Sequence, residues 1–586
     1  MATQLLTELQ GGAWLLHETA DVFSPERLSD DHRMISATAH EFMTNEVLPA
    51  IDRLEQNDWA LARALVAKAG ALGLVGTDVP ESFGGVDLDK AASILVGEAI
   101  GRSASFATTF GAETGLAIFP LLSFGSDAQK QQYLPGLAAG ETVGAYALSE
   151  SGSGSDAMAA RARAVQQPDG SFVLNGEKMW ITNGGFADLF IVFAKVDGEH
   201  FSAFLVERGF AGVSSGKEEH KMGLHGSSTT PLILQDARVP AGGLLGEVGK
   251  GHRVALNTLN YGRFKLAAMC TGGAKAAMAE AAAYASSRKQ FNQPIASFGA
   301  IQHKLGEMTA RVYGAESALY RTCGLIDSSL AASHDLPGAL EEFAIEASML
   351  KVSASEMLDY VLDENVQIHG GNGFVKDYPA ERHYRDARVN RIFEGTNEIN
   401  RLLVPGMLAR RALKGTLPLI AAVKALQDEL LAPPSLPSSA PDRMAAERTL
   451  VAGMKKTALA ILGTAMQTYG QKMVDQQEVL SFASDMITDA FVAESSLIRA
   501  LQAATDDAAR ATLHEAAARV VIHTAAARVE ASAREALAAM TQGDMLRTLL
   551  AALRRWLKSV PADLVSARRT LAGETIQRRK YAFDIH

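Results

Sequence analysis

Hydrophobic residues recur at helical spacing through the first part of the chain, and the spacing changes twice further on. Residues 32–54 and 59–74 carry apolar positions three and four apart, which predicts helices with one buried face. From about residue 145 to 245 the pattern changes to alternating and β-branched runs such as 189–193, which predicts strands. Helical spacing returns from Val254 to about residue 413. The pattern therefore predicts a helical domain, a compact β domain and a second helical domain.

The last part of the chain differs in composition. Residues 432–441 are rich in proline and serine and cannot sustain a helix, which predicts a linker, and the alanine-rich region after them favours helices. We expect a mostly α protein with a middle β domain (α+β), in which the β part forms a barrel or sandwich. The expected divisions are an N-terminal helical domain at 30–143, a middle β domain at 144–250, a helical bundle at 251–415, a linker at 416–441 and a C-terminal helical domain at 442–586.

Length, charge and cysteine content narrow the class of protein. A chain of 586 residues is long enough for about three to five domains. With 56 basic and 66 acidic residues, the net charge of −10 argues against a nucleic-acid partner. The two cysteines, Cys270 and Cys323, both fall in predicted helices, so neither a disulfide framework nor a cysteine zinc cluster is expected. We expect no metal site.

The two ends of the chain bear on its location. Residues 1–10 lack the basic flank and apolar core of a secretory signal and the arginines of a transit peptide. No run of about 18 uncharged apolar residues predicts a membrane-spanning helix. We therefore expect a cytoplasmic protein. Basic pairs near the C-terminus, such as Arg554-Arg555 beside Trp556, favour a solvated helix face, with peripheral membrane contact as the alternative.

Glu394 is the polar residue whose sequence context most clearly suggests a role as a general base. It is followed by Gly395 and then by Thr396, a favourable cap for the helix predicted to follow. A carboxylate in such a turn can serve as an exposed base. The alternative is that Glu394 only complements the positive end of that helix.

Two segments of the predicted β domain suit a polar ligand. Residues 146–156 form a short apolar strand and a glycine and serine loop, which offers backbone N–H groups and hydroxyls unless it is a flexible linker. Because residues 161–174 predict a β-hairpin, we expect the loop to be held between strands. In the second segment, Trp180 and Thr182 can supply a ring wall and a hydroxyl, although a buried core tryptophan is the alternative.

These segments, with residues 288–291, 367–374 and 393–396, occur in the order and spacing of acyl-CoA dehydrogenases, which the chain resembles from about residue 30 to about 410. The additional C-terminal region makes the chain most similar to the very-long-chain acyl-CoA dehydrogenase branch. Four further segments support that branch: residues 201–207, 221–223, 245–249 and 260–264.

The resemblance implies FAD-dependent α,β-dehydrogenation of long-chain fatty acyl-CoA to trans-2-enoyl-CoA in fatty acid β-oxidation, with electrons passed to an electron-transferring flavoprotein. The reaction needs a base for the Cα proton and an acceptor for the Cβ hydride, and no side chain accepts hydride. Glu394 corresponds to the family's general base. In the family, the flavin ribosyl hydroxyl and the backbone N–H of this glutamate bind the thioester carbonyl. Exclusion of water by the acyl chain should raise the pKa of Glu394.

Cofactor contacts are implied by position. Residues 146–155 correspond to the loop over the flavin, and residues 180–182 to the segment beside the isoalloxazine, where Thr182 bonds its reactive edge. Arg288 and Phe291, with residues 367–371, correspond to groups that reach the FAD of a neighbouring subunit, which implies a homodimer or a dimer of dimers. The residues expected to contact FAD are Tyr146, Leu148, Ser149, Gly154, Ser155, Trp180, Ile181, Thr182, Arg288, Phe291, Gln367, Gly370, Gly371, Thr396 and Asn397.

Substrate contacts are implied in the same way. Ser155 corresponds to a contact with the pantetheine arm, Gly395 lies beside the thioester, and Asn260 and Arg263 belong to the segment on the CoA side of the pocket. Arg263 is equally interpretable as a structural ion-pair partner.

The far end of the acyl cavity is expected near residues 110–113. Gly111 and Ala112 would leave this end open, which favours long acyl chains. Glu113 conflicts with that expectation, because an inward carboxylate would block an apolar tail.

Three residues depart from the family pattern. Ser149 stands where threonine is usual, and Ser151 replaces a proline, which should loosen the turn without removing a ligand. His369 stands where this branch more often has a hydrophobic residue, and we expect it to be structural because Glu394 already fills the acid–base role. Two alternatives to the dehydrogenase remain, an acyl-CoA oxidase that uses O2 and a family member recruited as a non-enzymatic assembly or binding factor.

Overall fold

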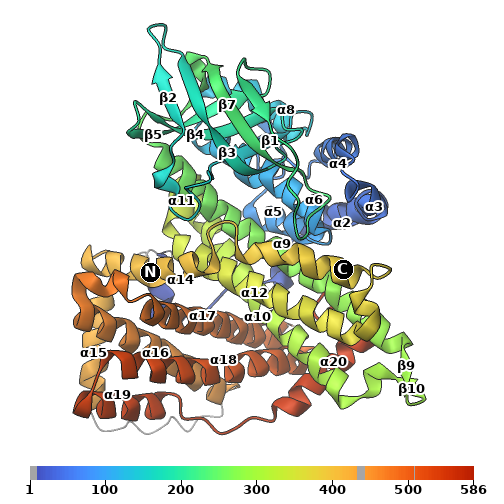
Figure 1. Ribbon diagram of the computed structural model, residues 1–586. Coiled ribbons are helices and arrows are strands. Elements are labelled where there is room, and N and C mark those ends of the chain that lie inside the picture. Colours follow the sequence, from blue (N-terminus) through green and yellow to red (C-terminus); the bar gives the residue numbers. More distant parts are fainter. Residues whose placement is uncertain (1–9, 432–442, 507, 586) are drawn as a thin grey trace.

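The computed structural model describes residues 10–431, 443–506 and 508–585. In Figure 1 a β-sheet lies at the top, a layer of C-terminal helices lies at the bottom, and the long helices α9, α10 and α12 run between them. The expected mostly α fold with a middle β domain is confirmed.

The N-terminal helices begin where the sequence supplies a capping side chain. Ser29, Asp58, Asp89, Ser103 and Ser126 each accept a backbone N–H of the first turn that follows. The continuation of α6 is a π-helical segment, residues 112–118, which forms part of the site described below. The helices of this domain are α2 (Asp30–Phe42), α3 (Ile51–Leu54), α4 (Trp59–Ala71), α5 (Lys90–Ile100), α6 (Ala104–Gly111), α7 (Phe119–Phe124) and α8 (Asp127–Ala138).

The middle domain is a sheet in the order β6-β7-β3-β2-β4-β5-β8, with β1 added in parallel to β4. The predicted hairpin around residues 168–170 is confirmed by the antiparallel pairing of β2 with β3. The strands are β1 (Gly144–Ala147), β2 (Arg163–Gln166), β3 (Phe172–Thr182), β4 (Leu189–Val196), β5 (His200–Glu207), β6 (Val213–Ser215), β7 (Thr229–Val239) and β8 (Leu244–Leu245).

The second helical domain is built on α9, which packs along α12 and α10. Cys270 and Cys323 are buried and free in α9 and α10, as the helical context predicted. The elements are α9 (Gly251–Ser287), β9 (Lys289–Gln290), β10 (Gln293–Pro294), α10 (Gly299–Ser333), α11 (Leu336–Glu342), α12 (Ala344–His369), α13 (Pro379–Ala387) and α14 (Asn397–Leu413).

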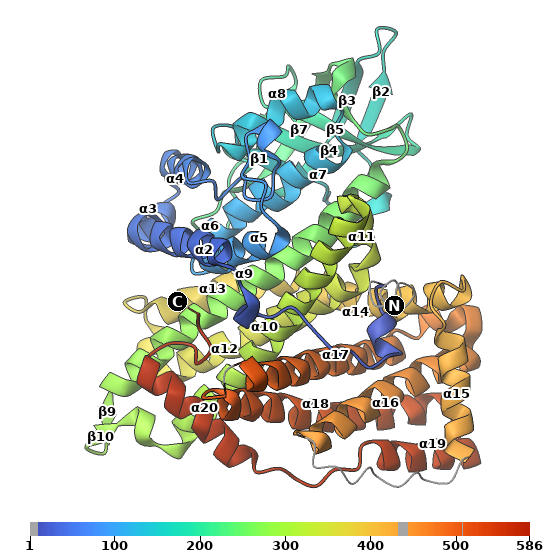
Figure 2. The same ribbon diagram turned by 180° about the vertical axis from the view of Figure 1, so that it is seen from behind.

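The remaining helices form a layer against α10, α12 and α14, as Figure 2 shows from behind. They are α15 (Leu419–Leu431), α16 (Ala445–Tyr469), α17 (Gln477–Asp506), α18 (Ala511–Met540), α19 (Gly543–Trp556) and α20 (Leu564–Arg578).

Helix α15 corrects the expected linker at 416–441. Leu419, Val423 and Leu426 are buried at helical spacing, and Val423 lies so close to Gly463 of α16 that a side chain there would collide with it. The apolar face of this segment therefore makes it part of the C-terminal layer. The proline-rich stretch 432–441 lies outside the described residues.

A segment before α2 also belongs to this layer, which the sequence did not predict. The Trp14 ring packs at a tilt against Phe491 of α17 with centroids 4.9 Å apart, and the Gly12 N–H donates to Glu346 of α12 at 2.7 Å. Lys455 of α16 donates to the His17 carbonyl. The start of the described chain thus joins the helical bundle to the C-terminal helices.

The apolar side chains beside the basic pair at residues 554–555 are not exposed to solvent. Trp556 and Leu557 are buried, whereas Arg554 is exposed, so the apolar residues beside the basic pair pack into the domain. This burial favours the solvated helix face over membrane contact at that point. Within the described ranges, no helix is both long and apolar enough to cross a membrane.

Candidate active site

Glu394 and Gly395 form a tight left-handed turn between residue 391 and the start of α14. Their φ angles are 58° and 77°, a conformation that is uncommon for a residue with a side chain and so marks a constrained position. The predicted cap is confirmed, because the Thr396 side chain accepts the Ile399 N–H at 3.2 Å. The turn therefore leads straight into a helix with a fixed first turn.

Two side chains hold the backbone of this turn. The Asn400 amide donates to the carbonyls of Glu394, Gly395 and Thr396 at 3.3, 2.9 and 3.0 Å. Arg263 of α9 donates through Nε to the Glu394 carbonyl at 3.0 Å and through Nη1 to Asn260 at 3.1 Å. Both hydrogen-bond partners of Arg263 are neutral, so these contacts anchor the turn, while its charge acts on the Glu394 carboxylate without a direct ion pair.

The Glu394 carboxylate is largely withdrawn from solvent. Its Oε2 is buried without a hydrogen-bond partner, and a methyl group at Gly262 would lie only 2.8–2.9 Å from the carboxylate atoms. Burial raises the pKa of Glu394 to about 7, and the positive charges of Arg263 and Lys351 offset part of that rise. A carboxylate with this pKa is a stronger base than a solvated one and is still about half ionised at pH 7.

Lys351 of α12 supplies one of those charges from a buried position. Its Nζ donates to Asn397 Oδ1 at 2.6 Å, and burial lowers the pKa of Lys351 to about 8. The predicted FAD ligand Asn397 is therefore itself buried and engaged by α12.

A cavity of about 100 Å³ opens beside Glu394 between α6, α9, α12 and the end of β3. Gly111 and Ala112 line it, as does Thr182. A Cβ at Gly111 would lie 3.1 Å from the Met269 methyl, so Met269 occupies the side of the cavity that Gly111 leaves free. The structure thus brings the predicted base, the predicted tail residues and one predicted flavin residue into a single cavity.

Glu113 does not obstruct this cavity. Its carboxylate accepts the Gly144 N–H at the start of β1, and burial raises the pKa of Glu113 to about 8. Gly115 and Leu116 of the same π-helical segment do line the cavity. Because the Glu113 side chain points to β1 and not into the cavity, it does not block an apolar acyl tail there.

The glycine and serine loop is anchored and not a free linker. Lys178, buried beneath it, donates to the Leu148 carbonyl at 3.2 Å and to Glu150 at 2.7 Å. The Met179 N–H donates to the Ser149 carbonyl at 2.9 Å. Beyond these anchors, a Cβ at Gly154 would meet no atom within 4 Å, so the loop presents open backbone to a ligand.

Trp180 lies at an irregularity of β3 and is 58% exposed, which excludes the core-tryptophan alternative for the described chain. Ile181 is buried in the sheet. The Tyr146 hydroxyl is buried without a hydrogen-bond partner, and burial raises the pKa of Tyr146, with the nearby charge of Glu394 adding to the effect. A large exposed ring and an unsatisfied hydroxyl are features that a bound aromatic cofactor can complement.

Arg288 and Phe291 lie far from this cavity. Arg288 directly precedes β9 at the end of α9, and Phe291, which is 87% exposed, lies in the turn of the β9–β10 hairpin (Figure 1). The 26 residues from Gly262 to Arg288 span about 39 Å of helix at 1.5 Å each. Gln367, Gly370 and Gly371 are also exposed, at the end of α12. One chain therefore does not bring these residues to its own Glu394.

His369 is buried as a structural residue. Its Nδ1 lies 2.8 Å from the Asn365 carbonyl, and its ring stacks on Tyr284 at 4.2 Å. The structure supports the expected structural role.

Sequence reasoning did not single out four residues of the site, Gly262, Met269, Lys351 and Asn400, although Gly262 lies within the pocket segment predicted from Asn260 to Arg263. A glycine inside a long predicted helix is a signal of close approach by another group, which could have drawn attention to Gly262. Asn400 follows Thr396 by one helical turn, but a single asparagine at that spacing carries no distinctive pattern. Met269 and Lys351 became visible only when the helices were placed side by side.

Comparison with known proteins identifies related chains. The sequence matches the acyl-CoA dehydrogenase N-terminal domain over residues 29–141, the middle domain over 145–237, and two C-terminal domain descriptions over 249–409 and 453–555. A probable acyl-CoA dehydrogenase of Bacillus subtilis is 44% identical over 594 residues, covering 99% of this chain and 100% of that protein. The human mitochondrial very long-chain specific acyl-CoA dehydrogenase is 42% identical over 366 residues, which cover 61% of this chain and 53% of that one.

The overall architecture also matches a solved structure. The crystal structure of an acyl-CoA dehydrogenase complexed with FAD from Bacillus anthracis superposes with a TM-score of 0.95 at 45% identity, covering 98% of this chain and 99% of that chain. The similarity therefore includes the C-terminal helical layer.

Proposed function

Because this chain belongs to the acyl-CoA dehydrogenase family, we propose that it removes the α and β hydrogens of long-chain fatty acyl-CoA to give trans-2-enoyl-CoA. The observation that carries the proposal is the Glu394 carboxylate, whose Oε2 is buried without a hydrogen-bond partner next to the cavity that Gly111 and Ala112 line. The general base of the reaction needs this combination of access to substrate and raised pKa.

The residues present fit FAD as the cofactor. Trp180 exposes a large ring, the Tyr146 hydroxyl is buried and unsatisfied, and Gly154 leaves open space where a side chain would stand. Phe291 and Gly370 are exposed at the distant surface that would meet the FAD of a second subunit. Thr182 lies in the wall of the Glu394 cavity, where it would bind the reactive edge of the flavin. When bound, FAD supplies the hydride acceptor that side chains lack.

The protein's own groups account for the proton chemistry. Glu394 takes the α-proton, Arg263 and Asn400 keep its backbone fixed, and Gly262 leaves room for the carboxylate. Lys351 adds a positive charge that keeps part of the Glu394 population ionised at neutral pH. The largely apolar lining of the cavity would keep water from the reacting carbons once the acyl chain fills it.

Anaerobic addition of acyl-CoA thioesters of graded length to the FAD-bound protein tests the proposal. We expect loss of flavin absorbance with saturated thioesters and none with the corresponding enoyl product. Flavin that stays oxidised with every acyl length would refute it.

The electron acceptor is tested separately. Oxygen consumption without another acceptor would identify an oxidase, whereas turnover that requires an electron-transferring flavoprotein supports the electron partner and the place in β-oxidation that we propose. We also propose a cytoplasmic location.

Acyl length should depend on the Gly111 and Met269 side of the cavity. A cavity of about 150 Å³ holds a benzene molecule, so a long chain needs more than the present 100 Å³, and the flexible Met269 can rotate to provide it. Catalytic efficiency should then rise with length, because each buried methylene adds about 0.8 kcal/mol of binding.

Two substitutions test which residues set the acyl length. We expect Gly111→Phe to suppress long substrates about tenfold or more while sparing short ones, and Met269→Ala to favour long ones. Equal losses at all lengths in Gly111→Phe would contradict the assignment.

Arg288 should bind the FAD of a second subunit. Since Arg288 lies at the far end of α9 from its own Glu394, we propose a homodimer in which it contacts a phosphate across the interface. We expect Arg288→Ala to weaken FAD binding about tenfold to a hundredfold, as for a lost hydrogen bond to a charged group, and to weaken dimerisation. Sedimentation and flavin content measure both, and Lys289→Ala, at the exposed neighbouring position, is the matched control. Full flavin content and full dimerisation in Arg288→Ala would show it to be a surface residue only.

A further inference from the structure

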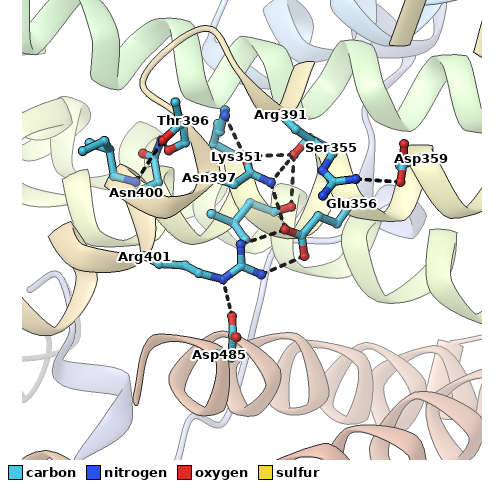
Figure 3. Close-up of polar contacts among 12 residues, drawn as sticks. Lys351, Ser355, Glu356, Asp359, Arg391, Thr396, Asn397, Asn400, Arg401 and Asp485 are labelled. Carbon is cyan, nitrogen blue, oxygen red and sulfur yellow. Dashed lines mark hydrogen bonds and ion pairs between the residues drawn. The ribbon is translucent and has the colours of Figure 1, made fainter. Parts of the chain in front are cut away.

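A cluster of charged side chains connects the catalytic helix α14 to the C-terminal helical layer (Figure 3). Arg401 of α14 donates through Nη1 and Nη2 to the two oxygens of Glu356 at 2.8 and 2.9 Å. Its Nε donates to Asp485 of α17 at 2.7 Å. The Nε, Nη1 and Nη2 atoms of Arg401 thus each donate to a carboxylate oxygen, and these hydrogen bonds fix the orientation of the guanidinium group.

The cluster continues to the first residue of α14. Glu356 Oε1 also accepts the Asn397 amide at 3.0 Å, and Asn397 Oδ1 accepts Lys351 Nζ at 2.6 Å. Lys351 is the buried cation that acts on Glu394. An unbroken series of hydrogen bonds therefore runs from Asp485 to the charge beside the base.

The same helix also holds the catalytic turn directly. Asn400, the residue before Arg401, donates to the carbonyls of Glu394 and Gly395. A shift of the first turns of α14 must therefore move the backbone of the base. Restraint of Arg401 from α12 and α17 is a restraint on Glu394.

The bridge lies beside a space that side chains do not fill. A cavity of about 440 Å³ lies between α10, α12, α17 and α18, and Arg401, Glu356 and Asp485 form part of its wall. The hydrogen-bonded bridge therefore adds to the packing of α14 on α17 at a place where neighbouring side chains leave a space.

We propose that Asp485 is a positioning residue for the dehydrogenation, through which the C-terminal helical layer sets the placement of Glu394 by way of Arg401. The inference rests on the proposed function, in which Glu394 is the base. It assigns the additional layer a part in catalysis that does not involve contact with substrate.

Asp489 provides a matched control. It lies one turn after Asp485 on α17 and beside the same cavity, but its partner is Arg528 of α18, at 3.1 Å from Arg528 Nε. Asp485→Ala and Asp489→Ala therefore each remove one carboxylate that accepts hydrogen bonds from arginine, and only the first removes a contact with α14.

The measurement is the single-turnover rate constant for flavin reduction at saturating acyl-CoA, with substrate affinity and thermal unfolding recorded for each variant. We expect Asp485→Ala to lower the rate constant on the order of tenfold, since small misplacement of a reacting group is costly, with substrate affinity nearly unchanged. Asp489→Ala should keep the wild-type rate constant. Asp485→Asn, which retains an acceptor oxygen for Arg401, should recover most of the rate.

A double variant tests the route. Arg401→Met alone should slow reduction at least as much as Asp485→Ala, and adding Asp485→Ala to it should cause little further loss, because both changes break one bridge. A rate constant that is unchanged in Asp485→Ala, or lowered equally in Asp489→Ala, overturns the positioning role. In either case wild-type flavin reduction stands, whereas failure of the proposed function would appear as no reduction in the wild type.

Discussion

Replacement of Glu394 by glutamine should leave FAD bound and abolish its reduction by acyl-CoA. The amide is nearly isosteric with the carboxylate but cannot take the α-proton, and loss of a general base costs on the order of a hundredfold to ten-thousandfold in rate. The geometry sharpens this expectation, because the buried Oε2 has no hydrogen-bond partner whose loss could damage the fold. Stopped-flow absorbance of the flavin after mixing with substrate is the measurement.

Glu398 separates the two interpretations of Glu394. It is exposed in the first turn of α14, where a carboxylate complements the helix dipole without reaching the cavity. Glu398→Gln should therefore retain wild-type reduction. Rapid bleaching of the flavin in Glu394→Gln would refute the assignment of Glu394 as the base and leave it with a structural role.

The pH dependence of the wild type follows from the same group. Only ionised Glu394 accepts a proton, and burial raises the pKa of this carboxyl to about 7. The catalytic efficiency should therefore rise with pH through about 7 and fall about tenfold per unit well below it. A profile that is flat down to pH 5 would contradict a buried base.

Much of the fold, and the helix cap that follows Glu394, were predictable because their signals are local. Thr396 caps α14 by interactions within four residues, and the hairpin around residues 168–170 needs only its turn and its alternating flanks. The positions of Thr182 and Gly111 relative to Glu394 are not local, and they came from the resemblance to a family. The structure confirms that all three residues line one cavity.

What could not be predicted depends on contacts between distant segments. The segment around Trp14 carries no periodicity of its own, and its burial against α17 depends on a surface made more than 400 residues later. Val423 lies in a stretch that resembles a linker until Gly463 provides a place for it. Arg401 and Asp485 are ordinary helix-surface residues in sequence, and only the juxtaposition of α14 with α17 makes them partners.

Gly262→Ala should impair catalysis without weakening the fold. Alanine is favoured over glycine inside a helix by about 1 kcal/mol, so α9 should be at least as stable. The added methyl would lie 2.8–2.9 Å from the Glu394 carboxylate, closer than carbon and oxygen atoms can pack, and the backbone of Glu394 is held by Asn400 and Arg263. The side chain must then rotate away from its position in the cavity, and a displacement of about 1 Å costs on the order of a hundredfold in rate.

Gly406→Ala is the matched control, since it makes the same change on α14, where a Cβ would meet no atom within 4 Å. Single-turnover flavin reduction and chemical unfolding should be measured on both variants and on the wild type. We expect Gly406→Ala to keep its rate, and Gly262→Ala to lose rate at undiminished stability. If instead Gly262→Ala reduces flavin as fast as the wild type, the carboxylate has another position from which it works, and the close approach of Gly262 to Glu394 is not what places the base.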